Sequence, residues 1–273
     1  MAFKSPPEIA RAGIATGASK AAMPPDKMLV AGFLAGAYIA FAGLVAIVVS
    51  AGMDPATWGG VQTLITGVAF VLGLVLVVIA GSELLTGNMA LVPLGALGGK
   101  VRVGRLTLDL LVVLVGNLLG SLFVAYFLAV KTGVVTAEAP LRRLGDIARV
   151  KGETETDWQI FLRAVGCNWL VCLAVWMALA AEDVGGKVLA IFFPIMAFVA
   201  MGFDHVVANM FFLPAAIFAD VPGIGWDDAL KNWLFAFLGN FVGAFLFVSL
   251  SYWYLYVRDA DRREPPDRAS ERA

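Results

Sequence analysis

The chain has 273 residues, of which 60% are hydrophobic and only 15% are charged, and its formal net charge is −1 at pH 7. A soluble domain is closer to half apolar and a quarter charged, so this composition indicates a membrane protein. The sequence lacks the basic patch that a nucleic-acid partner requires. Its two cysteines, Cys167 and Cys172, have neither the spacing of metal ligands nor a disulfide framework, and we expect no metal and no cofactor.

Six apolar runs follow one another along the chain, each long enough for the roughly 20 residues that a bilayer crossing needs. The first 27 residues lack the apolar core of a signal peptide and predict a short, weakly amphipathic helix on the membrane surface. Residues 258–273 are polar and contain prolines, which predicts a disordered tail. The expected organisation is an N-terminal segment over 1–27, a six-helix transmembrane domain over 28–257 and the tail. The apolar runs cover residues 28–51, 60–83, 106–130, 158–181, 188–219 and 230–257.

One pattern occurs twice inside the apolar sequence. Residues 81–93 are GSELLTGNMALVP and residues 202–214 are GFDHVVANMFFLP, an offset of 121 (202 − 81). Residues 116–120 (GNLLG) and 239–243 (GNFVG) repeat at an offset of 123 (239 − 116). With three passages per half, the second half enters the membrane from the opposite side, so the halves form an inverted repeat. The alternative is a chance match among residues that are common in membrane helices. Interrupted segments at matching places in two halves are typical of a transporter's substrate site.

Small residues also recur four positions apart, at Gly32 and Gly36, Gly116 and Gly120, and Gly239 and Gly243. This spacing lets helix backbones approach closely in lipid and predicts tight helix packing.

The distribution of Lys and Arg predicts the orientation. Thirteen of these residues lie on the side of the two termini and six on the other side. Because cytoplasmic loops carry the excess of positive charge, we expect a multi-pass protein of the cytoplasmic (inner) membrane with both termini inside.

The two interrupted segments should carry the chemistry. Irregular backbone at membrane depth is tolerated only where protein buries it or where it lines a cavity. We expect the interruptions near residues 84–94 and 200–207, each exposing a helix N-terminus that favours anions. Glu83 and Asp204 stand where each interruption begins. They are expected to cap the half-helices that follow, with direct contact to the substrate as the alternative.

His205 is the only histidine in the chain and lies in the second interruption. An ionisable group inside a membrane is a functional hypothesis by default, and histidine exchanges a proton near neutral pH. The alternative is a hydrogen-bonded core histidine with no role in transport. Asn209, Asn168 and Thr86 complete a sparse polar set within the apolar body.

The segments GFDHVVANMF, NWLVCLAVW and GSELLTGNM resemble the signature segments of the formate–nitrite transporter family, and the similarity extends over roughly 28–257. The resemblance implies an all-α membrane protein with six transmembrane helices in an aquaporin-like arrangement, with helices two and five broken by loops. It also implies a homopentamer in the lipid bilayer with a pore in each protomer. Such proteins are not enzymes, and they pass small monovalent anions, often together with protons.

The resemblance also assigns the pore. It implies a substrate pathway along His205, Asn209, Asn168 and Thr86, with Lys151 as the lysine of the outer vestibule. The spacing from Lys151 to Asn168 differs from the family by about one residue, so Arg149 or Arg163 could take that role. Where the family often has Glu before the histidine, this chain has Asp204. The implied apolar constrictions are Leu84 on the outer side, Phe70, Leu74 and Phe198 on the inner side, and Val171.

Three functions compete. The first is passage of small anions, formate before nitrite, as anion–proton symport or as the neutral acid, with hydrosulfide or another small weak acid as a variant. The second is a neutral-solute channel of aquaporin type, which typically carries Asn-Pro-Ala twice, whereas this chain has Asn-Met in both repeats. The third is a membrane-embedded enzyme, which one histidine and scattered acids support poorly. The sequence favours the first.

Overall fold

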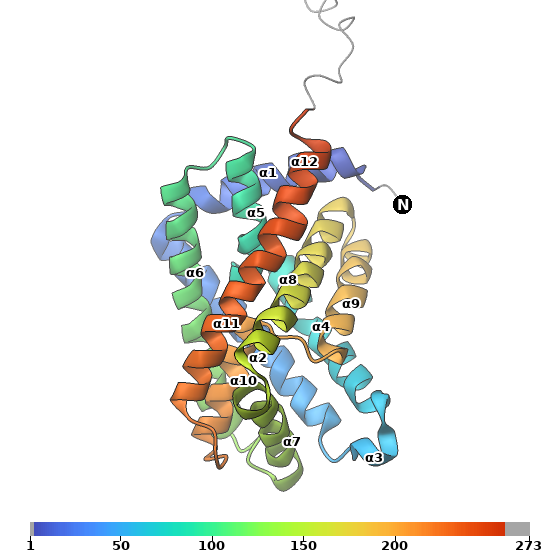
Figure 1. Ribbon diagram of the computed structural model, residues 1–273, viewed down its shortest axis with the longest axis vertical. Helices are drawn as coiled ribbons and strands as arrows, with labels where there is room; N and C mark the ends of the chain where they lie inside the picture. Colours follow the sequence, from blue (N-terminus) through green and yellow to red (C-terminus); the bar gives the residue numbers. More distant parts are fainter. Residues whose placement is uncertain (1–2, 260–273) are drawn as a thin grey trace, which may run out of the picture.

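The computed structural model describes residues 3–259, so the predicted disordered tail lies almost entirely outside the described residues. Long helices pack side by side along the long axis of the molecule (Figure 1). The α-helices are α1 (Pro6–Ala22), α2 (Pro25–Ser50), α3 (Pro55–Trp58), α4 (Gly60–Ala80), α5 (Leu85–Leu97), α6 (Val103–Phe123), α7 (Glu138–Arg149), α8 (Asp157–Ala180), α9 (Val184–Ala200), α10 (Val206–Phe218), α11 (Trp226–Ala244) and α12 (Ser251–Tyr256). Three π-helical segments extend α6, α7 and α11, namely η1 (Val124–Val130), η2 (Val150–Thr154) and η3 (Phe245–Leu250).

Within residues 3–259, five helical stretches are long and apolar enough to cross a membrane. They are α2, α4, α6 with η1, α8, and α11 through α12. The expected passage at 188–219 is instead divided between α9, with 17 residues, and α10, with 13 residues. The chain is therefore an all-helical membrane-spanning protein, and the count of six passages stays a prediction.

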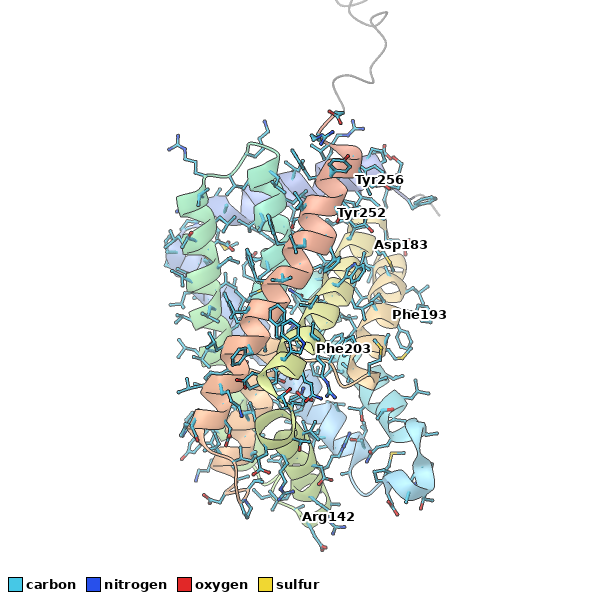
Figure 2. The ribbon with its side chains drawn as sticks, in the orientation of Figure 1. Arg142, Asp183, Phe193, Phe203, Tyr252 and Tyr256 are labelled. Atoms are coloured by element: carbon cyan, nitrogen blue, oxygen red, sulfur yellow. The ribbon has the colours of Figure 1, made fainter. Side chains whose placement is uncertain are left out.

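The outer surface of the bundle is apolar. Large hydrophobic side chains are exposed along most of the long helices, including Leu64, Leu111, Leu162 and Leu189. Phe193 on α9 is 62% exposed and points away from the bundle (Figure 2). Apolar surface of this extent matches lipid or neighbouring subunits better than water.

Both interruptions begin with a glycine in the left-handed region. Gly81 has φ 77° after α4, and Gly202 has φ 71° after α9. The chain is then extended, and helix resumes at Leu85 in α5 and at Val206 in α10. The second interruption lies where it is predicted. The first covers 81–84 rather than 84–94, because Pro93 lies inside α5 without ending it. Neighbouring groups satisfy freed backbone around such prolines in membrane helices.

The glycine spacing predicts the closest helix contacts correctly. A Cβ at Gly36 of α2 would overlap the backbone of Asn117 in α6, and a Cβ at Gly243 of α11 would overlap the carbonyl of Val165 in α8. Only glycine permits these two helix pairs to lie so close.

The N-terminal segment forms a helix, as predicted, but it packs on the protein. α1 runs across one end of the bundle, close to α5 and α12 (Figure 1). Its Ile9, Ala10, Gly13 and Gly17 are buried, and a Cβ at Gly17 would overlap the backbone of Leu91 in α5. α1 therefore closes over one of the two cavities described below.

Candidate functional site

Two cavities enter the bundle from its opposite ends, where α1 and α7 lie (Figure 1). The α1-side cavity has a volume of about 390 Å³ and is lined by Lys20, Glu83, Leu84, Asn88 and Lys187 among others. The α7-side cavity has a volume of about 340 Å³ and is lined by Phe70, Lys151, Phe198, His205 and Asn209 among others. Each cavity therefore holds at least one lysine together with polar side chains next to an interrupted helix.

A hydrogen bond between Thr86 and His205 joins the two interrupted helices. Thr86 Oγ1 lies 2.8 Å from His205 Nε2, and both residues are buried. His205 also forms the N-cap of α10, because its Nδ1 accepts a hydrogen bond from the Ala208 N–H at 3.1 Å. A neutral imidazole carries one N–H, so with Nδ1 accepting, Nε2 must donate to Thr86. In this arrangement the Thr86 hydroxyl hydrogen is free to bind a passing ligand.

The α7-side network surrounds Asp204. Asp204 Oδ1 accepts from Lys151 Nζ at 2.9 Å and from Asn209 Nδ2 at 2.8 Å. Asn209 Nδ2 also donates to Asn232 Oδ1 at 2.8 Å. Burial by itself lowers the pKa of the Lys151 ammonium, but the negative charges of Asp204 and Glu155 reverse this and raise it. Lys151 is therefore charged at all physiological pH values.

Glu155 lies beside this network at the start of α8 and is paired with Arg163. Burial, with a further contribution from Asp204, raises the pKa of Glu155 from 4.5 to about 7. Lys151 and Arg163 act in the opposite direction but do not cancel the increase. The charge beside the Lys151–Asp204 pair therefore changes near neutral pH.

The α1-side network has the same pattern around Glu83. Glu83 Oε2 accepts from Lys20 Nζ at 2.8 Å and from Asn88 Nδ2 at 2.8 Å. Asn88 Nδ2 also donates to Asp109 Oδ1 at 2.9 Å. Glu83 and Asn88 precede Asp204 and Asn209 by 121 residues, so the repeated motif forms the same contacts twice.

Glu83 and Asp204 do not cap the half-helices, which corrects the sequence prediction. Leu84 and His205 occupy the N-cap positions. The first free N–H of α5, on Leu85, donates to Asn117 Oδ1 at 2.9 Å, and that of α10, on Val206, donates to Asn240 Oδ1 at 2.9 Å. The carboxylates of Glu83 and Asp204 bind lysine and asparagine side chains instead.

Asn117 and Asn240 are the residues that sequence reasoning missed. Each Nδ2 donates to the carbonyl of the acidic residue in the interruption, Glu83 at 2.9 Å and Asp204 at 2.8 Å. The same Nδ2 also binds a carbonyl of a neighbouring helix, Gly32 O or Ala164 O, at 2.8 Å in both cases. The signal was present in the GNLLG and GNFVG pair, which was interpreted as part of the internal repeat and as glycine packing, without a role for the asparagines.

Three of the predicted constriction residues lie on the wrong side relative to Lys151, which was predicted in the outer vestibule. Phe70 and Phe198 line the α7-side cavity with Lys151, whereas Leu84 lines the α1-side cavity. Leu74 lies on the α1 side as predicted. Chain direction explains the correction: α4 starts near α3, towards the α7 end, and Leu84 follows its far end (Figure 1).

Aromatic rings narrow the α7-side cavity next to His205. The Phe198 ring stacks on His205 with centroids 5.9 Å apart, and Phe70 meets Phe198 edge-on at 6.0 Å. Phe212 of α10, which sequence reasoning did not select, stacks on Phe70 at 6.4 Å.

Asn168 and Val171 of α8 are buried behind the site and line neither cavity. Asn168 Nδ2 donates to the carbonyls of Thr86 at 3.1 Å and Asn240 at 2.9 Å. It therefore positions the turn that carries Thr86.

Lys20 was also missed, because α1 was expected on the membrane surface rather than over a cavity. Arg163 lines the α7-side cavity alongside Lys151, whereas Arg149 does not. Over residues 3–259 no group of three or more His, Cys, Asp and Glu side chains is placed to hold a metal ion.

Comparison with known proteins gives a consistent result. The profile of the family described as "Formate/nitrite transporter" matches residues 7–254. A "Probable formate transporter" of Methanothermobacter thermautotrophicus is 47% identical over 94% of this chain and 98% of its own. Among solved structures, an "FNT family ion channel" has a TM-score of 0.84 at 32% identity, covering 91% of this chain and 98% of its own. A "Pentameric formate channel with formate bound" has a TM-score of 0.75 at 31% identity, covering 86% and 98%.

These relatives are named as transporters and channels, and the enzyme hypothesis is set aside. Because sequence and fold agree over nearly the whole chain, this protein belongs to the formate/nitrite transporter family.

Proposed function

We propose that the protein passes small monovalent anions, formate first and nitrite next, across the cytoplasmic membrane through a pore in each protomer. The names of similar proteins support this substrate class, since one is a probable formate transporter and another is a channel with formate bound. The observation that carries the proposal is the Thr86–His205 hydrogen bond between two cavities that each contain a lysine.

Charge explains the layout of the pathway. Lys151 in one cavity and Lys20 in the other attract anions to either end. Between them, a bare anion meets Phe70, Phe198 and Leu84, and leaving water there costs several kcal/mol or more. Because the Thr86 hydroxyl oxygen accepts from His205, the hydroxyl hydrogen can be donated to the anion at this point. Adding a proton then removes the charge that opposes crossing.

Two sources of that proton are compatible with the site. In the arrangement described, His205 is neutral, so giving up its Nε2 proton requires immediate replacement. Water in a cavity can instead protonate the anion directly, with His205 and Thr86 holding it by hydrogen bonds. Either route produces anion–proton symport or passage of the neutral acid, and substitution of His205 distinguishes them.

We also propose the finer architecture that the sequence predicts. Six passages would arise if the α4–α5 and α9–α10 pairs each make one interrupted passage. Asn88 and Asn117 bind Glu83 in the first half as Asn209 and Asn240 bind Asp204 in the second, and this match supports two halves related by an axis in the membrane plane. The exposed apolar surface and the pentameric relative support a homopentamer in lipid. Charge distribution supports two cytoplasmic termini.

The test is uptake into proteoliposomes that contain the purified protein. Labelled formate, nitrite and hydrosulfide are compared with and without an inward proton gradient, while light scattering reports water permeability. We expect protein-dependent formate and nitrite uptake that the gradient accelerates. Water or small neutral solutes crossing without any anion would instead establish the neutral-solute channel. Hydrosulfide alone crossing would favour the weak-acid variant.

Thr86 offers a matched pair of variants for the same assay. Thr86→Val keeps the shape of the side chain and removes the hydroxyl, whereas Thr86→Ser keeps the hydroxyl. Uptake should fall in the valine variant and recover in the serine variant. Equal uptake by both variants would exclude the hydroxyl from the pathway.

A further inference from the structure

Asp109 is a buried acid that the pathway described above does not use. It lies on α6 with no exposed surface. Its Oδ1 accepts the hydrogen bond from Asn88, but its Oδ2 has no partner among the described residues. The Oδ1 of Asn88 is also without a partner there. A carboxylate oxygen buried without a donor is costly, and such a group either binds a partner or becomes neutral.

The α7-side network shows which atom stands in the corresponding place. Asn232 follows Asp109 by 123 residues, the same offset that relates Asn117 and Asn240. Asn232 Oδ1 accepts from Asn209, as Asp109 Oδ1 accepts from Asn88. The second polar atom of Asn232 is a donor, and its Nδ2 binds Lys151 O at 3.1 Å and Asp204 Oδ1 at 3.4 Å. Asp109 Oδ2 is therefore the counterpart of Asn232 Nδ2, which is a hydrogen-bond donor in the α7-side network.

The charges lead to the same conclusion. Lys20 from α1 is paired with Glu83, and within residues 3–259 no cation forms an ion pair with Asp109. Arg105, one turn earlier on α6, donates to the carbonyls of Ala21 and Met23 instead. The α1-side network thus has two carboxyl groups for one ammonium.

The other helices packed against α6 add no charge at this point. α10 carries no charged residue, and the charged residues of α2, Asp26 and Lys27, are exposed in its first turn. A single proton would make the α1-side network neutral and give it the same donor pattern as the α7-side network.

We propose that Asp109 is a proton-binding site, and that in the resting protein its Oδ2 carries a proton as a neutral carboxylic acid. The protonated Oδ2 supplies a donor at the position that Asn232 Nδ2 occupies in the other half. Glu83 lines the α1-side cavity and shares the Asn88 amide with Asp109, so the proton exchanges with cavity water through the Glu83 carboxylate. When the proton leaves as hydronium, the O–H bond breaks, its electron pair stays on Asp109, and the network gains one negative charge beside Lys20.

Loss of this proton makes the charge of the α1-side network depend on pH. The proton site itself does not depend on the proposed anion passage, but its effect on anion entry does. An ionised Asp109 beside Glu83 repels an anion that enters from the α1 side. Entry from that side should therefore decline as the pH there rises. Asp109→Asn keeps the donor pattern and removes the proton site, so it should abolish this decline.

Infrared difference spectroscopy tests the proton site without any transported substrate. Protein in liposomes is compared in H₂O and D₂O and across a pH titration, and the carbonyl stretch of protonated carboxylic acids is followed. Glu155→Gln is measured in parallel to identify the separate signal of Glu155. We expect Asp109→Asn to lose one band that wild type and Glu155→Gln retain. An unchanged spectrum in Asp109→Asn would overturn the proposal.

Asn232→Asp provides the converse test in case Asp109→Asn does not fold. It places a second acid against Asp204 and should gain one protonated-acid band, whereas a spectrum without that gain would count against the argument. Because both spectra are recorded without substrate, their failure leaves the proposed function intact. Failure of formate uptake with the expected spectra would refute the proposed function alone.

Discussion

Removing the charge of Lys151 separates its structural role from its role in collecting anions. The Lys151 ammonium lies 2.9 Å from Asp204 Oδ1, and the two side chains are 11% and 0% exposed. In Lys151→Met, Asp204 Oδ1 loses its cation and keeps the amide donors of Asn209 and Asn232. Breaking a buried ion pair at one partner costs about 3–5 kcal/mol. Since Lys151 retains some exposure, we expect a loss of about 3 kcal/mol.

The double variant Lys151→Met with Asp204→Asn should recover most of that loss. The amide has nearly the shape of the carboxylate and needs no cation. Unfolding of the four proteins of this cycle in mild detergent gives the interaction energy between the two side chains. If Lys151→Met were as stable as wild type, the Lys151–Asp204 ion pair would not contribute to the free energy of unfolding.

Formate uptake by the stable double variant then measures the role of Lys151 in attracting the anion, separately from its role in stability. Without the ammonium, the α7-side cavity loses its central positive charge, so half-saturation should require more formate while the fold is intact. Because the pKa of Lys151 is raised, the ammonium that this variant removes is charged in the wild-type protein across about pH 5 to 8. Uptake identical to that of wild type would reduce Lys151 to a purely structural role.

Three further predictions test other parts of the structure. The pKa of Glu155 is raised from 4.5 to about 7, so between these pH values the folded state keeps a proton that the unfolded state has lost. The stability of the protein should therefore fall as the pH rises from 4.5 to 7. Glu155→Gln should flatten this pH dependence of the melting temperature. Gly243→Ala places a Cβ against the Val165 carbonyl and should lose about 1–3 kcal/mol, whereas Gly104→Ala, which has open space, should be neutral or stabilising by about 0.5 kcal/mol; equal melting of the two would contradict the close packing. His205→Asn should separate anion flux from proton flux or abolish passage of the acid while the oligomer persists. Uptake indistinguishable from wild type between about pH 5 and 7.5 would assign the proton to cavity water.

The interruptions could be predicted from the sequence because their causes are local. Gly81 and Gly202 adopt a left-handed conformation that side chains disfavour, and the motif around them occurs twice. The extent of the first interruption was wrong because Pro93 was counted as a helix breaker. Whether a proline ends a helix depends on neighbours that satisfy its backbone, and those neighbours are known only from the fold.

The partners of the buried charges could not be predicted, because they come from distant parts of the chain. Lys20 reaches Glu83 across 63 residues, and Lys151 reaches Asp204 across 53. A motif identifies the acid but not the cation that it binds. Lys151 was selected only through the family resemblance, and nothing in the motif around Glu83 indicated Lys20.

We infer that the two half-helices differ as candidate anion sites, although an asparagine anchors each of them in the same way. Asn117 and Asn240 each bind the first N–H of the resumed helix. In α10 the next N–H groups are partly used, because His205 Nδ1 accepts from Ala208. In α5 the residue at the same position, Leu84, has no acceptor side chain, so α5 presents one more free N–H. In the proposed pathway, hydrogen-bond donors for the anion are therefore concentrated at α5, beside the Thr86 hydroxyl, whereas α10 contributes the His205 ring, which binds this hydroxyl.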